Sequence, residues 1–321
     1  MSTTNPKNPI FSAEERRRAL FVLLAITVIW GWTFVWMKQA ISQAELTLGP
    51  GGQDAAKGAF LTLRFGSAAA LLPFLLPASC RRSNWSMGLV LRGGTLGVLL
   101  LVGFLLQMTA LADLSPGVSA FLTSLYVIFT AFLSLFNPRH RHISGALLVG
   151  VLLATLGAAF ISGPPQLEFG FAEWLTVLSA FIFACSILVT DSATRRHAPA
   201  AVSLVSFMTV TLGAGIYTAW VLSQAGAPAT SELTGLLGEY DFWWPLACCS
   251  ILATLFALSA LNHFQRMLPP VRAATLYALE PVWGAVISIL YGMEVIDGWL
   301  AVGAGALLLG NMIAELGPTR S

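Results

Sequence analysis

The repeated occurrence of long apolar segments constrains this chain more than any other feature. A bilayer-spanning helix needs about 20 mostly apolar residues, because the hydrocarbon core is about 30 Å thick. Ten segments meet this length, and Pro, Gly or charged residues separate them, as at Pro164-Pro165 and Pro269-Pro270. The predicted spans are residues 19–40, 57–77, 93–113, 116–136, 143–162, 170–190, 201–222, 242–264, 270–291 and 296–315.

Composition agrees with a chain whose solvent is mainly lipid. A soluble domain carries about 25% charged residues, whereas this chain of 321 residues has 10%. The first apolar run, 19–40, is long enough to span a bilayer and lacks a convincing cleavage site, so we predict a retained helix rather than a signal peptide. The four cysteines show neither disulfide nor metal-ligand spacing, and we expect no metal and no cofactor. We therefore predict an all-α integral membrane protein.

The distribution of basic residues provides an independent test of the ten spans. Cytoplasmic loops are enriched in Lys and Arg, and a missed span would mix the two sides. Apart from Lys38, Lys57 and Arg64, all basic residues fall on one side of the predicted membrane. The loop 223–241 on the opposite side has no Lys or Arg. We predict a plasma (bacterial inner) membrane protein with both termini cytoplasmic. The scattered charges also argue against a nucleic-acid partner. The 14 of 17 basic residues on the predicted cytoplasmic side are Lys7, Arg16, Arg17, Arg18, Arg81, Arg82, Arg92, Arg139, Arg141, Arg195, Arg196, Arg266, Arg272 and Arg320.

The sequence also repeats internally. The segment 114–136 matches 268–290 at an offset of 154, which places Pro116 on Pro270. The next predicted helices match at an offset of 153, with Ile143 on Ile296. An odd number of helices per repeat inserts the second copy upside down, as in many secondary transporters. We predict a cytoplasmic segment 1–18 and two inverted five-helix repeats, 19–162 and 170–315, with a solute site between them.

Several segments together resemble a known family. They are IWGWTFVWMKQA (29–40), LTLRFGSAAALL (61–72), SAFLTSLYVIFTAFLSL (119–135) and QRMLPPVRAATLYALEPVWGAVISILYGMEVI (265–296). In this order they resemble the EamA-type transporters of the drug/metabolite transporter superfamily. One departure is that Met293 separates Gly292 from Glu294, two residue types that often adjoin in that family. The resemblance implies ten helices that export amino acids, metabolites or drugs by alternating access.

Two ionisable residues lie deep inside predicted spans, where an unpaired charge is costly. Glu280 lies about 15 Å and Arg64 about 10 Å from the nearer boundary, at 1.5 Å per residue. Glu280 could bind a proton or a cationic group of the solute, or it could bond neighbouring backbone or pair with Arg64. Arg64 could bind a carboxylate or phosphate. We favour a structural role for it, because a long side chain can reach water from this depth.

Other candidates follow from helix geometry. Pro281 removes the backbone donor for the carbonyl of Tyr277, so the helix should kink beside Glu280 and could form a gate. Tyr126 is the counterpart of Glu280 in the repeat and should line the same cavity. Trp30 and Thr33 share one face of the first helix.

Polar residues on the matched helices complete the expected site, although half or more of them should bond their own helix. Thr123 and Tyr277 belong to this set. By contrast, Gln107, Asn262 and His263 lie near predicted helix ends, and interfacial positions explain them without a site.

We predict a secondary transporter, an exporter of small metabolites, amino acids or drug-like solutes, with a proton or other ion as a coupling partner. The alternatives are a nucleotide-sugar or sugar-phosphate exchanger and a lipid-headgroup flippase. An enzyme is not expected, because Ser124 and His263 form no recognisable catalytic motif. A channel is not expected either, because no filter segment is present. Small residues predict tight helix contact within or between chains, including a homodimer; they are Gly150, Gly157, Gly303 and Gly310.

Overall fold

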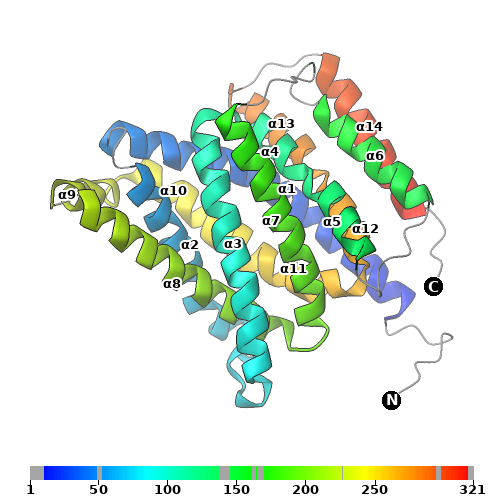
Figure 1. The fold of residues 1–321 in the computed structure, drawn as a ribbon, viewed down its shortest axis with the longest axis horizontal. Coiled ribbons are helices and arrows are strands. Elements are labelled where there is room, and N and C mark those ends of the chain that lie inside the picture. Colours follow the sequence, from blue (N-terminus) through cyan, green and yellow to red (C-terminus); the bar gives the residue numbers. More distant parts are fainter. Residues whose placement is uncertain are drawn as a thin grey trace.

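The chain folds into packed helices throughout the part that the computed structural model describes, residues 11–48, 53–136, 145–160, 164, 170–225, 227–293 and 298–316 (Figure 1). The first-half helices are α1 Ala13–Leu48, α2 Gln53–Leu75, α3 Met87–Asp113, α4 Pro116–Ser124, α5 Tyr126–Leu135 and α6 Gly145–Ala159, with short 3₁₀ turns η1 Pro77–Cys80 and η2 Arg82–Asn84. The second-half elements are α7 Phe171–Thr194, α8 Pro199–Ala225, α9 Ala227–Leu236, α10 Tyr240–Cys248, the π-helix η3 Cys249–Leu258, α11 Ser259–Phe264, the 3₁₀ turn η4 Gln265–Met267, α12 Pro270–Tyr277, α13 Glu280–Leu290 and α14 Gly298–Leu316.

Eight helical segments of the described chain are long and apolar enough to cross a membrane. Two of them combine consecutive helices, Pro116–Leu135 and Pro270–Leu290, and a third runs from Tyr240 to Met267. The predicted spans 143–162 and 296–315 fall on the shorter apolar helices α6 and α14. An all-helical, multi-pass membrane protein is therefore confirmed, while the count of ten spans and the inversion of the halves stay predictions.

Some expectations from the sequence differ from the structure or lie outside it. The expected loop 223–241 lies between two candidate membrane spans, of which one ends at Gln224 and the next begins at Tyr240. It is largely helical, because α8 continues to Ala225 and α9 follows, with Leu233 and Leu236 buried. Residues 13–18 of the expected N-terminal segment are already part of α1. Several residues used above lie outside the described part of the chain: Lys7, Arg139, Arg141, Ile143, Pro165, Glu294, Ile296 and Arg320.

Helices of the two halves interleave instead of forming separate bundles. α2 packs along α8, α3 packs against both α7 and α8, and α1 packs against α10 and α13. Gly31 permits the close approach of α1 to α13, because an added Cβ there would lie 2.5 Å from the Cβ of Trp283. Gly31 is therefore a contact residue between α1 and α13. This interleaving places the centre of the molecule between the two halves.

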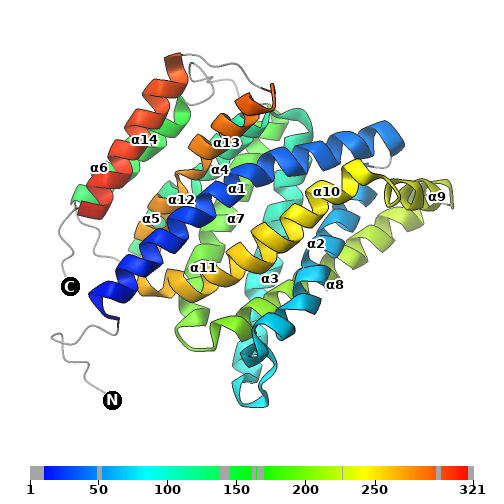
Figure 2. The same cartoon turned by 180° about the vertical axis from the view of Figure 1, so that it is seen from behind.

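The pair α6 and α14 forms a unit of its own at one side of the molecule (Figures 1 and 2). An added Cβ at Gly310 would lie 2.5 Å from the backbone nitrogen of Ala154 and 2.7 Å from the carbonyl oxygen of Gly150. The glycines at 157 and 303 meet in the same way, so the predicted tight contact is confirmed within one chain. Their use in a homodimer stays a prediction.

The two matched helices are both interrupted in the middle of the membrane-spanning length. α4 ends at Ser124 and α5 begins at Tyr126, while α12 ends at Tyr277 and α13 begins at Glu280. The sequence predicted the second break from Pro281, which lacks a backbone N–H. The first break, at Leu125, occurs without proline, since Val127 stands where the second half has Pro281.

Replacing Gly310 by leucine should separate α6 from α14 and lower the thermal stability of the purified protein. Overpacking of this kind costs about 1–3 kcal/mol. Gly305→Leu on the same helix is the matched control, because a Cβ at Gly305 meets nothing within 4 Å. Melting temperatures in detergent would test this, and equal melting of both variants would contradict the contact.

Candidate functional site: a cavity between the two halves

A central cavity lies between the two halves of the chain. Nine of its lining residues belong to 19–162 and eleven belong to 170–315. All seven predicted solute or coupling residues line it, whereas Pro281 does not. The predicted lining residues are Trp30, Thr33, Arg64, Thr123, Tyr126, Tyr277 and Glu280, and the others are Leu96, Leu100, Phe104, Gln107, Phe183, Ser186, Ile187, Thr190, Phe207, Leu258, Leu261, Asn262 and Gln265.

Glu280 is the one acidic residue among the lining residues described. Its side chain is 8% exposed, and the hydroxyl of Tyr126 donates to Oε2 at 3.4 Å. No ion pair with Arg64 or another cation forms within the described residues, so the expected alternative of a locking ion pair is absent. A buried carboxylate with a single hydroxyl partner needs a proton or a cation from outside the chain to balance its charge.

Arg64 is buried at 1% exposure, which makes the expectation that it reaches water at the outer surface wrong. Its Nε donates to Oγ1 of Thr254 at 2.7 Å, and its guanidinium carbon lies 4.6 Å from the ring centroid of Phe104. Nη1 lies 3.6 Å from the sulfur of Met37, which is a weak acceptor. A guanidinium has five N–H donors, and no carboxylate of the described chain pairs with it. Arg64 therefore retains donors for an anionic group in the cavity.

The π-helix η3 explains why Thr254 is available to Arg64. Its hydroxyl donates to the carbonyl of Cys249, five residues earlier, at 2.9 Å and accepts the bond from Arg64. A π-helix widens the turn, and such segments often occur at functional sites. The sequence carries no proline or glycine in 249–258 that could have predicted it.

Two glutamines that the sequence reasoning assigned no role attach the interrupted helices to their neighbours. Gln107 of α3 donates to Oγ1 of Thr123 on α4 at 3.1 Å. In the second half, Tyr277 of α12 donates to Oε1 of Gln265 at 3.1 Å, and Gln265 donates to the carbonyl of Ile187 at 2.8 Å. Thr123 and Tyr277 occupy matched positions of the repeat, since 277 − 123 = 154.

The interfacial placement expected for two of the polar residues near predicted helix ends is wrong. Gln107 and Asn262 are both 3% exposed and line the cavity, where Asn262 donates to Oγ of Ser203 at 2.8 Å. The only sequence signal was their polarity on otherwise apolar helices. His263 points elsewhere, into a separate groove described below.

Aromatic side chains form much of the cavity wall. Trp30 lies edge-on to Tyr277, with ring centroids 5.5 Å apart, and its Nε1 approaches the carbonyl of Ala253 at 3.4 Å. Thr33 bonds its own helix through the carbonyl of Trp30. Lys38 is held at the end of α3, where its Nζ donates to the carbonyls of Leu111 and Ala112. The cavity therefore combines one cation, one acid and an aromatic surface.

The volume of the cavity limits the size of what it can hold in this conformation. About 90 Å³ is open to the centre of a water molecule. This is room for a few water molecules or a small solute.

Comparison with known proteins gives a consistent result. Residues 170–315 match the EamA-like transporter family. A protein of Archaeoglobus fulgidus described as an uncharacterized transporter is 23% identical over 305 residues, which cover 92% of this chain and 84% of the relative. A solved crystal structure superposes with a TM-score of 0.65 at 17% identity and covers 91% of this chain and 96% of the other. The structural likeness supports the fold.

Thr254→Val should destabilise the protein, because it removes the one oxygen partner of the buried Arg64 guanidinium. A buried donor left unsatisfied costs about 1–3 kcal/mol, more for a charged group. Thr95→Val is the control, since Thr95 is exposed and bonds only its own helix. Melting temperatures of the purified variants would test this. If neither variant melts at a lower temperature than the unmodified protein, the contact of Arg64 with Thr254 is not important for stability.

Proposed function

We propose that this protein is a membrane transporter that carries small solutes with an anionic group by alternating access. The match of residues 170–315 to the EamA-like transporter family supports transport as the function. The observation that supports the solute class is the meeting of Arg64 from the first half and Glu280 from the second half in one cavity. Arg64 would bind a carboxylate or a similar anion through its free donors. Glu280 would bind a proton or a cationic group of the same solute.

The charge of the cavity favours this solute class over the alternative of a nucleotide sugar or sugar phosphate. Phosphates carry several negative charges and require several cations. Arg64 is the one cation among the lining residues described, and Glu280 opposes further negative charge. A zwitterionic or amphipathic solute with a few heavy atoms, such as an amino acid or a small drug-like acid, satisfies both side chains and can stack on Trp30.

We infer the orientation in the membrane from charge placement and the direction of transport from the family resemblance. The start of α1, the turns η1 and η2, the end of α7 and the end of α11 lie along one edge of the molecule in both views (Figures 1 and 2). Arg16 to Arg18, Arg81, Arg82, Arg195, Arg196 and Arg266 belong to these segments. The positive-inside rule then puts this edge on the cytoplasmic side of the plasma membrane, and the family resemblance favours export.

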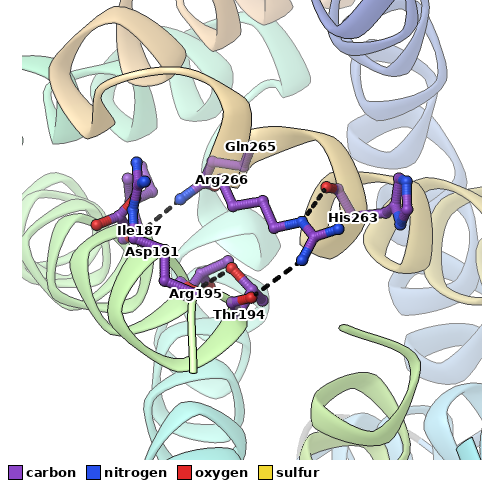
Figure 3. Close-up of polar contacts among 8 residues, drawn as sticks. Ile187, Asp191, Thr194, Arg195, His263, Gln265 and Arg266 are labelled. Atoms are coloured by element: carbon purple, nitrogen blue, oxygen red, sulfur yellow. Dashed lines mark hydrogen bonds and ion pairs between the residues drawn. The ribbon is translucent and has the colours of Figure 1, made fainter. Parts of the chain in front are cut away.

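The paired glutamine contacts offer a mechanism for alternating access. Gln107 lies about 9 Å, at 1.5 Å per residue, from the end of α3 opposite the basic edge. Gln265 lies next to Arg266 at the basic edge (Figure 3). The Gln107 contact holds α4 and the Gln265 contact holds α12, each of which lies just before an interruption. Breaking one contact would let that helix bend and open the entrance to the cavity on its side. The Gln107 contact would then close the outer entrance, and the Gln265 contact would close the cytoplasmic entrance.

The solute can be found by a thermal-shift screen of the purified protein against amino acids, other small acids and cationic drugs, since a ligand of the folded state stabilises it. Hits should carry an anionic group, and Arg64→Gln should abolish their shifts. Stabilisation by neutral or purely cationic compounds alone, undiminished in Arg64→Gln, would contradict the assignment of Arg64.

Glu280→Gln should separate coupling from binding in proteoliposomes loaded with a hit from the screen. If Glu280 carries a proton, the variant keeps solute counterflow but loses acceleration by a pH gradient, because glutamine cannot exchange a proton. If Glu280 binds a cationic group of the solute, counterflow itself is lost. Glu232→Gln on α9 is the exposed control. Unchanged transport across pH in Glu280→Gln would exclude both roles.

The glutamine contacts can be tested by labelling a single cysteine at Ser186, a lining residue, in a background with the four native cysteines replaced by serine. Gln265→Leu should increase labelling by a membrane-impermeant maleimide from the basic side, and Gln107→Leu from the other side. Gln43→Leu is the control, since Gln43 bonds within its own helix. Labelling that changes on the same side in both variants would contradict the mechanism.

A further inference from the structure

A second hollow of the molecule is an apolar groove that opens on its flank. Its walls come from the end of α2, from η1, from the start of α8 and from the outer face of η3 and α11. Leu72, Leu76, Ala200, Leu252 and Phe256 are typical of its lining, and His263 is its one ionisable residue. Measured in the same way as the 90 Å³ of the central cavity, the volume of the groove is about 730 Å³.

The surroundings of the groove are apolar and exposed, as expected of a surface that faces lipid. Phe74 is 83% exposed and Leu75 is 65% exposed. Trp85, after η2, is also exposed, and Trp is enriched at membrane interfaces. A groove of this composition in lipid is suited to hydrocarbon and not to a polar solute.

Basic residues follow the apolar walls at the same end of the molecule. Arg81 and Arg82 come directly after η1, which contributes Ala78 to the groove and packs against α8. Arg196 precedes Ala198, another lining residue. All three arginines are exposed, and none forms an ion pair within the part of the chain described.

Neighbouring arginines are held by the protein itself, which distinguishes them from these three. Arg195 pairs with Asp191 at 2.7 Å, and Arg266 donates to the carbonyls of His263 and Thr194 (Figure 3). These contacts fix the end of α7 against η4 beside the groove. The exposed guanidinium groups of Arg81, Arg82 and Arg196 are left to face the membrane surface.

We propose that this groove binds an anionic phospholipid, with an acyl chain along the apolar walls and the phosphate near Arg81, Arg82 and Arg196. The acyl chain of the lipid accounts for the apolar lining, and the negative charge of its headgroup matches the three exposed arginines. Neither feature depends on what the central cavity transports. A transmembrane helix of another protein would fill the apolar part but would leave the exposed arginines unused.

The groove and the central cavity share a wall. Ile251, Leu252 and Leu255 face the groove, while Leu258 and Leu261 of the same continuous segment face the cavity. A bound lipid therefore braces the segment that carries Thr254, the partner of Arg64. We expect the lipid to stabilise the folded protein measurably.

The test measures melting of the purified full-length protein in detergent while phosphatidylglycerol or phosphatidylcholine with identical acyl chains is added. The phosphatidylglycerol concentration for half-maximal stabilisation should be at least about tenfold lower than that of phosphatidylcholine. Each arginine near an anionic lipid surface contributes up to about tenfold in affinity, and three arginines are available. Arg81→Gln/Arg82→Gln should remove most of this preference. Arg16→Gln/Arg17→Gln, on α1, removes two exposed charges away from the groove lining and should keep it.

The position of the acyl chain has its own pair of variants. Ala200→Phe fills the groove and should weaken stabilisation by both lipids, whereas Ala219→Phe, exposed on the same helix, should not. Equal response to the two lipids, a preference retained in Arg81→Gln/Arg82→Gln, or unchanged binding in Ala200→Phe would each overturn the proposal. Equal stabilisation by glycerol 3-phosphate would also overturn it, since that result would indicate a phosphate site without a chain.

Discussion

The structure depends on one constraint, which is that polar groups inside a bilayer must be satisfied by the protein itself. Regular helices meet this constraint along most of the chain. Irregular backbone is tolerated at membrane depth only where it is buried in protein or lines a cavity. The interruption between α12 and α13 and the π-helix η3 follow this rule, since both adjoin the central cavity.

The same constraint gives the two buried charges their importance. Arg64 and Glu280 come from different halves, and each has fewer partners in the chain than its charge requires. Because an unpaired charge in a low-dielectric interior is costly, such a site is expected to be occupied by solute, proton or water whenever the protein is in the membrane. The cost of burying these two charges is thus the physical basis of the proposed selectivity. The aromatic walls limit the size of the solute.

The sequence predicted the features that depend on pattern. Span length predicted the helices, the spacing of glycines predicted the contact of α6 with α14, and Pro281 predicted the break beside Glu280. The seven lining residues could be predicted because few polar or aromatic residues occur on the first two helices and on the matched helices, so each of them was a candidate. Their functional roles stay predictions.

The wrong predictions of side-chain position have a common cause. The depth of each residue in the membrane was counted along a straight helix from its nearest end. Gln107 and Asn262 seemed interfacial by this count, yet both are buried against the cavity. Arg64 seemed able to reach water, yet it turns inward to Thr254, which is 190 residues away in the sequence. Helix tilt, the π-helix and contacts between distant segments decide these positions, and none of them is legible from local periodicity.

Alternating access, as proposed for this protein, requires that two halves of opposite orientation enclose one cavity. The most direct measurement is the side from which a membrane-impermeant thiol reagent reaches a single cysteine, either native Cys80 or Glu232→Cys, with the other cysteines replaced by serine. These positions lie between the second and third spans of the first and second halves, respectively, and both are exposed. Opposite orientation predicts labelling of Cys80 from the cytoplasm and of the position-232 cysteine from outside. Labelling of both from the same side would contradict the account.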